Sequence, residues 1–539
     1  MTFAEAVLDR PDTHWRIEQA HRAALLIDGA AYFRALAHAM ERARQSIFIL
    51  GWDLRSDLLL EPESSTETLA ARLNRLIRAS DTLHVRILIW DWPMVLAADR
   101  ELLPQWGFGP FEERLTFVLD DEIPFGAAHH EKLVVIDDRL AFVGGIDLTA
   151  GRWDTPEHHP ANLRRQKVDS GPERRPFHDA MLMVEGPVAE ALGELAAERW
   201  RRATGDRPTS GGRDSEKPGG AGCWPDWVEP DLEGIPIAIA RTRPEMPGFV
   251  AAREIEAFYV AAIAGAERLV YIENQYLTIS SIARKLVARL CAVQDLEIVI
   301  VTPEACEGPL ETAVMDAGRK VFKGILQGEA PERVRVLTAQ SHGVAVNIHA
   351  KLMAIDDRLF TIGSANLANR SMGVDTETNL VIERPVCDPV IRGWRHRLLA
   401  EHLGREPGEI AACEEELGST VALIDRLSDP QDEHHLAQLD LDEHPIPEPL
   451  AELFDVTELV DPPEPIIGTQ LLFELGLPKR NRDLRRWIGR AAGLAALVVM
   501  LAWLVGWIEH LPEWTVIATV VFLLLIWLVG VRIWRLERF

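Results

Sequence analysis

Cysteine is scarce in this sequence, and basic residues are outnumbered by acidic ones. The five cysteines among 539 residues form no Cys-x-x-Cys pair, which argues against a disulfide framework and a cysteine-based zinc site. Lys and Arg number 57 against 83 Asp and Glu, for a net charge of −26. Because phosphate backbones repel such a surface, we expect no nucleic-acid partner. The N-terminal segment is acidic and has no apolar stretch, so no cleavable signal peptide is predicted.

Two long uncharged runs lie near the C-terminus, at 491–508 and 514–531. Each would be about 27 Å long as a helix, close to the thickness of a hydrocarbon core. Lys and Arg flank the pair on both outer sides, and the short connection has neither. The positive-inside rule therefore predicts a transmembrane hairpin over 488–535 with both flanks in the cytoplasm. A hairpin buried in a soluble domain is the alternative, which uncharged runs of this length disfavour.

These features predict an integral membrane protein, of a bacterial inner membrane, with its folded body on the cytoplasmic side. Export by a route that needs no signal peptide is the alternative location.

Composition divides the rest of the chain. A Gly/Pro-rich stretch at 203–233 reads as a linker, and an acidic, Pro-containing stretch at 407–487 reads as a solvated linker with some helix inside it. We therefore predict one folded half over 1–202 and a second over 234–406.

The two halves carry an internal repeat. HEKLVVIDDRLAFVGGIDL at 130–148 matches HAKLMAIDDRLFTIGSANL at 349–367, and DAMLMVEGP at 179–187 matches ETNLVIERP at 377–385. Short apolar, β-branched runs alternate with helical patterns in both halves, as in parallel sheets covered by helices. The predicted fold class is α/β, with two repeated α/β/α units related by pseudo-two-fold symmetry and sharing one active site.

Each copy of the repeat begins with His-x-Lys. In an extended strand these two side chains lie on the same face, so His130 points with Lys132 and His349 with Lys351. A neutral imidazole can attack phosphorus and form phosphohistidine, while the second imidazole serves first as acid and then as base. The lysines would stabilise the non-bridging oxygens, and the scheme needs no metal and no cofactor.

Acidic residues accompany each histidine. An imidazole in this role needs a carboxylate on its second ring nitrogen, and Asp179 and Glu377 open equivalent strands. Which carboxylate serves which histidine stays open. Asp137 and Asp356 stand where the strand turns, so we expect them to shape the loop rather than take part in chemistry.

Chance occurrence of the motif and metal binding are the two alternatives to a catalytic site. A single His-x-Lys-x4-Asp pattern arises often by chance, but two copies with the same downstream residues do not. Metal ligation by His129, His130 and His349 is disfavoured because the adjacent lysines would repel a cation.

The duplicated His-x-Lys-x4-Asp pattern, followed by a glycine-containing segment, resembles the signature of the phospholipase D superfamily. Other segments are similar to its eukaryote-type phospholipase D branch more than to its cardiolipin synthase branch: GGIDL (144–148), GRWDTPEH (151–158), FHD (177–179), IENQY (272–276) and NRSMG (369–373). The resemblance covers about 31–385.

The resemblance implies that the motif histidines are nucleophile and acid, with His130 the usual nucleophile. The residues to which it assigns phosphate contact are Lys132, Lys351, Gly145, Ser364 and Asn366. Asp147 stands in the first motif where the second has Asn366.

The activity expected from the resemblance is that of a phospholipase D, which hydrolyses a membrane phospholipid to phosphatidic acid and a head-group alcohol through phosphohistidine. A phosphatidyltransferase of the cardiolipin synthase type, in which an alcohol replaces water, is the first alternative. A nuclease is disfavoured by charge and by the membrane hairpin, and a scaffold without activity by the intact His-Lys pairs. Protein partners are not predicted.

Overall fold

In a computed structural model of the chain, the structure describes residues 6–91, 101, 104–109, 113–124, 126–165, 175–208, 222–246, 248–306, 309–328, 330–441 and 461–464. All of them belong to one compact unit. Across these ranges we find no helix with the length and apolar character needed to cross a bilayer. The predicted hairpin at 491–508 and 514–531 lies outside the described residues.

The first half alternates strands and helices along the chain. Its elements are a 3-10 turn η1 (Val7–Asp9), β1 (Arg16–Ile27), α1 (Asp28–Arg42), β2 (Ser46–Gly51), α2 (Leu69–Ala79), β3 (His84–Trp90), α3 (Pro104–Gly107), β4 (Leu115–Asp120), β5 (Leu133–Ile136), β6 (Leu140–Gly144), β7 (Phe177–His178), β8 (Ala180–Glu185) and α4 (Pro187–Thr204).

The second half repeats that succession and adds elements at its end. It contains β9 (Leu232–Arg243), β10 (Ala252–Arg253), α5 (Glu254–Ala264), β11 (Leu269–Asn274), α6 (Ser280–Ala292), β12 (Glu297–Val301), α7 (Pro309–Gln327), β13 (Val334–Ser341), β14 (Val344–Ala345), β15 (Asn347–Ile348), β16 (Lys351–Ile355), β17 (Leu359–Gly363), α8 (Asn369–Gly373), β18 (Glu377–Glu383), α9 (Pro389–Leu403), α10 (Pro407–Leu417), α11 (Thr420–Leu427) and β19 (His434–Gln438).

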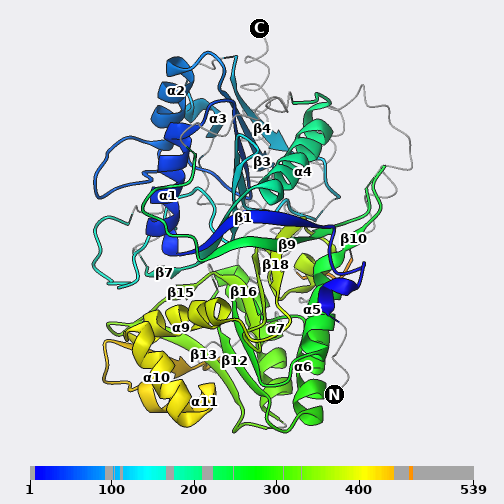
Figure 1. Cartoon of the computed structure of the whole chain (residues 1–539), viewed down its shortest axis with the longest axis vertical. Helices are drawn as coiled ribbons and strands as arrows, with labels where there is room; N and C mark the ends of the chain where they lie inside the picture. The colour runs from blue at the N-terminus through cyan, green and yellow to red at the C-terminus, as the bar shows by residue number, and fades with distance from the viewer. Residues whose placement is uncertain are drawn as a thin grey trace, which may run out of the picture. The chain divides into compact units, whose positions relative to one another are not determined.

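The strand order is the same in the two halves. The first runs β4-β3-β2-β5-β6-β8-β1 and the second β13-β12-β11-β16-β17-β18-β9, with β2, β3 and β4 parallel as are β11, β12 and β13. Antiparallel pairing of β1 with β9 joins the two sheets, and the two strands lie side by side in Figure 1. The predicted α/β class is confirmed.

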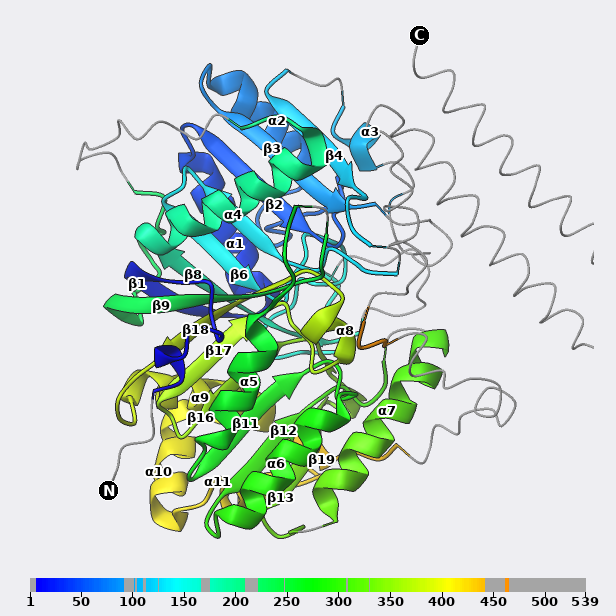
Figure 2. The ribbon, with the colours of Figure 1, turned by 90° about the vertical axis from the view of Figure 1, so that its right-hand side faces the viewer.

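Helices cover both faces of each sheet. In the first half α1 and α2 pack on one face and α4 on the other. In the second half α5, α6 and α7 lie along one face (Figure 2), and α9, α10 and α11 cover the other. The core that contains α4 and α9 continues from one half into the other, so apolar burial holds the halves together.

The segment 407–441, predicted as part of the acidic linker, is folded into the second half. Helices α10 and α11 bury apolar side chains such as Ile410 and Leu423 in the core, and β19 pairs with β13. The linker prediction is wrong for these residues. Composition misleads because acidic side chains such as Glu415 and Glu416 lie on the exposed face of α10, while Glu414 pairs with the buried Arg395 of α9.

The predicted linker at 203–233 is also shorter than composition suggests. Helix α4 extends to Thr204 and β9 starts at Leu232. Residues 209–221 lie outside the described residues.

Candidate active site

Short parallel pairings between the halves hold the two motif histidines. His130 N donates to Thr376 O at 3.0 Å, next to a bridge between His129 and Thr376. His349 N donates to His178 O at 2.8 Å, at the end of the pairing of β15 with β7. Each half therefore fixes the backbone of the other half's histidine.

The orienting carboxylates are exchanged between the halves. His130 Nδ1 lies 3.0 Å from both carboxylate oxygens of Glu377, at the start of β18. His349 Nδ1 lies 2.7 Å from Asp179 Oδ2, just before β8. The sequence left this pairing open, and the structure makes it crossed. Since each dyad takes one member from each half, neither half has a complete dyad alone.

The two His-Lys pairs face one electrostatic environment. Burial, followed by the charges of Lys132 and Lys351, holds the pKa of His130 well below its ordinary value. Burial and then Lys351, Arg152 and Lys132 do the same to the pKa of His349. Both rings are therefore neutral at neutral pH, with Nδ1–H toward the carboxylate and Nε2 as the nitrogen available to a substrate.

The two carboxylates are buried as well. Burial raises the pKa of Asp179 to about 7, against the opposing charge of Lys351. Burial raises the pKa of Glu377 to about 8, while hydrogen bonds from Ser364 and Ser371 favour its ionised form. An imidazolium that forms during a reaction would be stabilised by the ionised form of the carboxyl group beside it.

The two lysines have different partners. Lys132 Nζ lies 3.0 Å from Asp147 Oδ2. Lys351 Nζ donates to Gln275 Oε1 at 3.0 Å and makes no ion pair with a described residue. Burial lowers the pKa of Lys351 to about 7. An anion bound in the site would therefore stabilise the charged form of Lys351 more than that of Lys132, which already has Asp147 as its counter-ion.

Gly145 and Ser364, predicted to contact phosphate, lie next to the carboxylates of Asp179 and Glu377. Their N–H groups donate to Ala180 O and Thr378 O. Ser364 Oγ donates to Glu377 Oε2 at 2.5 Å. A Cβ on Gly145 would lie 2.3 Å from Asp179 Oδ1, so glycine leaves room for that carboxylate. Contact of either residue with phosphate stays a prediction.

Asn366 differs from these two residues. Its Oδ1 is buried and has no hydrogen-bond partner among the described residues, and its backbone N–H donates to Ser371 Oγ at 3.1 Å.

Asp137 and Asp356 occupy equivalent turns. Each has a φ of 54°, in the left-handed region that Asp tolerates better than most residues. Asp137 accepts hydrogen bonds from the backbone N–H groups of residues 44–46, and Asp356 from those of residues 267–269. These bonds tie the turn after the motif strand to the start of β2 or β11, which accounts for both aspartates structurally.

Sequence reasoning missed a buried cluster behind His349. His178 Nδ1 lies 2.5 Å from Glu401 Oε1, and its Nε2 lies 2.7 Å from Glu273 Oε2. Burial opposes protonation, but the two carboxylates outweigh it and hold the pKa of His178 well above its ordinary value. The signal was present, because His178 and Glu273 fall in the FHD and IENQY segments.

Groups of side chains close enough to share a metal ion occur in this cluster: Asp28, His158, His178 and Glu401, and also His178, Glu273 and His402. Both ring nitrogens of His178 point at carboxylate oxygens, which fits an imidazolium donating two hydrogen bonds better than a metal ligand. Among the described residues, neither group includes His129, His130 or His349.

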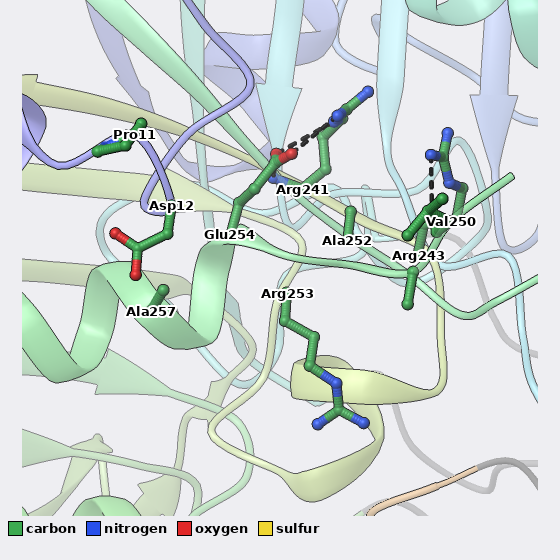
Figure 3. A pocket seen from close by; sticks show the side chains of 10 residues that line it. Pro11, Asp12, Arg241, Arg243, Val250, Ala252, Arg253, Glu254 and Ala257 are labelled. Carbon is green, nitrogen blue, oxygen red and sulfur yellow. Dashed lines mark hydrogen bonds and ion pairs between the residues drawn. The ribbon is translucent and has the colours of Figure 1, made fainter.

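A cavity of about 450 Å³ opens elsewhere on this unit, beside β9 and α5. Its lining includes Arg241, Arg243, Arg253 and Glu254, and Figure 3 shows Arg241 and Glu254 pointing at one another. Their ion pair measures 2.8 Å. No predicted site residue lines this cavity, so we place the candidate active site at the histidines.

Comparison with known proteins agrees with the repeat. The family described as "Phospholipase D" matches residues 119–214, and the family described as "Cardiolipin synthase, PLD-like domain" matches residues 259–394. The chain is similar to phospholipase D alpha 2 of Oryza sativa subsp. japonica, at 24% identity over 70% of this chain and 64% of that protein. It is also similar to phospholipase D alpha 4 of Arabidopsis thaliana, at 26% identity over 64% and 59%.

The chain thus spans less than two thirds of the length of these curated relatives. Among solved structures, phosphatidylserine synthase of Haemophilus influenzae Rd KW20 aligns at 15% identity, with a TM-score of 0.48, over 83% of this chain and 94% of that one. One matched range lies in each half of the chain, and each contains one copy of the duplicated motif. Each half of the chain is therefore similar to a phospholipase D or phospholipase D-like domain.

Proposed function

We propose that this chain is a phospholipase D-type phosphodiesterase, which hydrolyses a glycerophospholipid to phosphatidic acid and a head-group alcohol. The observation that carries the proposal is the crossed pair of dyads, His130 with Glu377 and His349 with Asp179. Curated relatives named phospholipase D support the lipid substrate.

In the first step, His130 Nε2 attacks phosphorus and a P–N bond forms as the P–O bond to the head group breaks. His349 gives its Nε2 proton to the leaving alkoxide, which departs as the alcohol. The side chain of His130 is 16% exposed and that of His349 is 6% exposed, which favours His130 as the nucleophile that the substrate reaches. The negative charge of the bound substrate phosphate raises the pKa of His349, so its ring takes a proton from the solvent before the first step.

In the second step, neutral His349 takes a proton from water as the water oxygen attacks phosphorus. The P–N bond breaks, phosphatidic acid leaves and His130 is restored. Glu377 and Asp179 stabilise whichever ring is an imidazolium, and they stay hydrogen-bonded to it throughout. Lys351 and Lys132 are the cations available to the non-bridging oxygens, and Asn366 is a further candidate there.

A phosphatidyltransferase is the second candidate, because the family matched by the second half is described as cardiolipin synthase-like. It would use the same covalent intermediate and replace water with an alcohol. Thin-layer analysis of the products with and without glycerol or phosphatidylglycerol separates the two functions.

We also propose that the hairpin at 491–508 and 514–531 anchors the enzyme in a bacterial inner membrane, with the catalytic body in the cytoplasm. The uncharged runs and their flanking arginines support this. Protease treatment of intact cells and of inverted vesicles tests it: digestion of the body from outside intact cells would reverse the orientation.

Head-group release from phosphatidylcholine, measured in a buffer that chelates divalent ions, tests the activity. We expect the wild-type chain to release choline and both His130→Ala and His349→Ala to lose at least about 10³-fold in rate. Release by either variant at the wild-type rate, or failure of the wild type across a panel of phospholipids, would contradict the proposal.

A further inference from the structure

Helix α8, a five-residue helix beside the candidate site, lacks a cap of its own. The residue before it is Ala368, which makes no side-chain capping bond. The first N–H groups of a helix have no partner within the helix and need one from outside. The partner is Asp461, from a segment about 90 residues further along the chain: Asp461 Oδ1 accepts from Arg370 N at 2.7 Å, and Asp461 Oδ2 accepts from Asn369 N at 3.0 Å.

The carboxylate of Asp461 is held firmly in this place. Asp461 is 3% exposed. Thr278 Oγ1 donates to its Oδ2 at 2.5 Å, and Asn369 Nδ2 donates to the same oxygen at 3.2 Å. A buried carboxylate with several donors is costly to remove, because the donors would be left without partners.

From α8 a short series of hydrogen bonds leads to the first motif histidine. Ser371, on α8, donates through Oγ to Glu377 Oε1 at 2.7 Å and accepts from Asn366 N at 3.1 Å. Glu377 in turn faces His130 Nδ1 at 3.0 Å. The position of α8 therefore decides whether one of the two serine donors reaches Glu377.

We propose that Asp461 is a positioning residue for Glu377, acting through α8 and Ser371, so that the segment leading toward the C-terminus sets the orientation of His130. This inference rests on the proposed function. By sequence, the same segment precedes the predicted membrane hairpin.

The other dyad provides an internal control. Asp179, which orients His349, accepts a second hydrogen bond from the next residue, Ala180 N, at 2.7 Å. Among the described residues, no hydrogen bond or ion pair joins Asp179 to α8 or to Asp461. A change at Asp461 should therefore alter His130 and leave His349 as it is.

The pH dependence supplies a readout that a merely structural role would not move. The hydrogen bond from Ser371 lowers the pKa of Glu377, so its loss should raise that pKa further. The other charged groups around Glu377 are His130, Lys132, Glu131, Lys351 and Asp375, and Asp375 is itself paired with Arg370 of α8 at 2.7 Å. The acidic limb of the activity profile should then move to higher pH, because more alkaline conditions are needed to ionise Glu377.

The experiment compares Asp461→Ala with a matched control, Glu464→Ala, in the full chain. Glu464 belongs to the same segment, but its side chain is 70% exposed, and its ion-pair partner within the described part of the chain is Arg253. For Asp461→Ala we expect kcat to fall about tenfold at unchanged KM, as for loss of a hydrogen bond to a charged group, together with the shift of the acidic limb. Glu464→Ala should match the wild type in all three quantities.

A second readout needs no substrate. In spectra of protein labelled with ¹⁵N-histidine, Asp461→Ala should move the Nδ1 resonance of His130 and leave that of His349 in place. Unchanged His130 resonance, or equal changes in both rings, would overturn the proposal. If the wild type cleaves no phospholipid, the proposed function fails while these spectra still decide the role of Asp461.

Should Asp461→Ala fail to fold, Asp461→Asn is the second variant. Asparagine keeps one acceptor oxygen, so the same effects are expected at smaller size. A folded Asp461→Asn protein with wild-type kcat, pH profile and spectra would overturn the proposal.

Discussion

The two copies of the motif share a backbone frame and differ in how they handle charge. In the first copy Lys132 is neutralised by Asp147 at 3.0 Å, whereas in the second Lys351 faces the amide of Gln275. The position of Asp147 is taken by Asn366 in the second copy. One lysine is thus already paired before substrate arrives, and the other is a buried amine whose charged form would be stabilised by the substrate phosphate.

The carboxylates differ in a coordinated way. Asp179 is short and packs against Gly145, while Glu377 is longer and is held by the hydroxyls of Ser364 and Ser371. Serine would not fit at position 145, and glycine at position 364 would leave Glu377 one donor short. The duplication has therefore diverged in pairs of residues, so that two equal motifs give two unequal histidines.

The largest difference is expected between the two lysine substitutions. Lys351→Met should lower kcat/KM by about 10³-fold without loss of stability, because it removes a buried cation that lacks a counter-ion. Lys132→Met should cost about 3–5 kcal/mol of unfolding free energy, because it leaves Asp147 buried without its partner. Kinetics with a soluble short-chain phospholipid and chemical denaturation measure the two effects. Equal losses of stability would break the comparison.

A smaller difference is expected at the paired small residues. Gly145→Ser should reduce kcat by about 10²-fold, because the new Cβ would displace Asp179 from His349. Ser364→Gly should reduce it about tenfold, through loss of one donor to Glu377. Side-by-side kcat values decide, and a more severe effect at position 364 would argue against the packing explanation.

Stability against pH sharpens the contrast between the lysines. Burial lowers the pKa of Lys351 from 10.5 to about 7 in the folded chain. Below 10.5 the unfolded chain binds this proton and the folded chain does not, so folding loses stability as pH falls from 10.5 toward 7. As pH falls from 10.5 to about 7, the stability advantage of Lys351→Met over the wild type should grow, and at lower pH it should stay constant. Denaturation at a series of pH values measures it, and a constant difference would refute the assigned shift.

The smallest difference is expected at the turn aspartates. Asp137→Ala and Asp356→Ala each leave three backbone N–H groups without an acceptor. We expect each variant to lose about 2–3 kcal/mol of unfolding free energy with little change in kcat once folded. Thermal melts and rates at a permissive temperature test this. A selective loss of kcat at either position would return these residues to the chemistry.

Features that depend on short stretches of sequence were predicted correctly. Apolar runs and the doubled His-x-Lys segment were enough for the α/β class, for the motif histidines and lysines, and for Asp179 and Glu377 as their carboxylates. The crossing of the dyads was beyond reach, because Glu377 meets His130 through a pairing between distant segments. The cap that Asp461 supplies to α8 has the same long-range character.

The linker prediction for residues 407–441 was wrong for a different physical reason, which amino-acid composition does not show. The acidic stretch at 407–441 looked solvated, yet its apolar residues are spaced to face the core of the second half. The hydrogen bond from the Ser364 hydroxyl to Glu377 was likewise not visible in the sequence, because it joins residues 13 positions apart.

The central claim is that two histidines, one from each half, act on a single phosphorus atom. Its most direct test is the stoichiometry of the covalent intermediate, measured by intact mass after rapid mixing with a short-chain phosphatidylcholine and an alkaline quench. The account predicts no more than one phosphatidyl group per chain, located on the peptide that contains His130 and absent from His130→Ala. Two phosphatidyl groups on one chain, or an intermediate that turns over normally in His349→Ala, would contradict it.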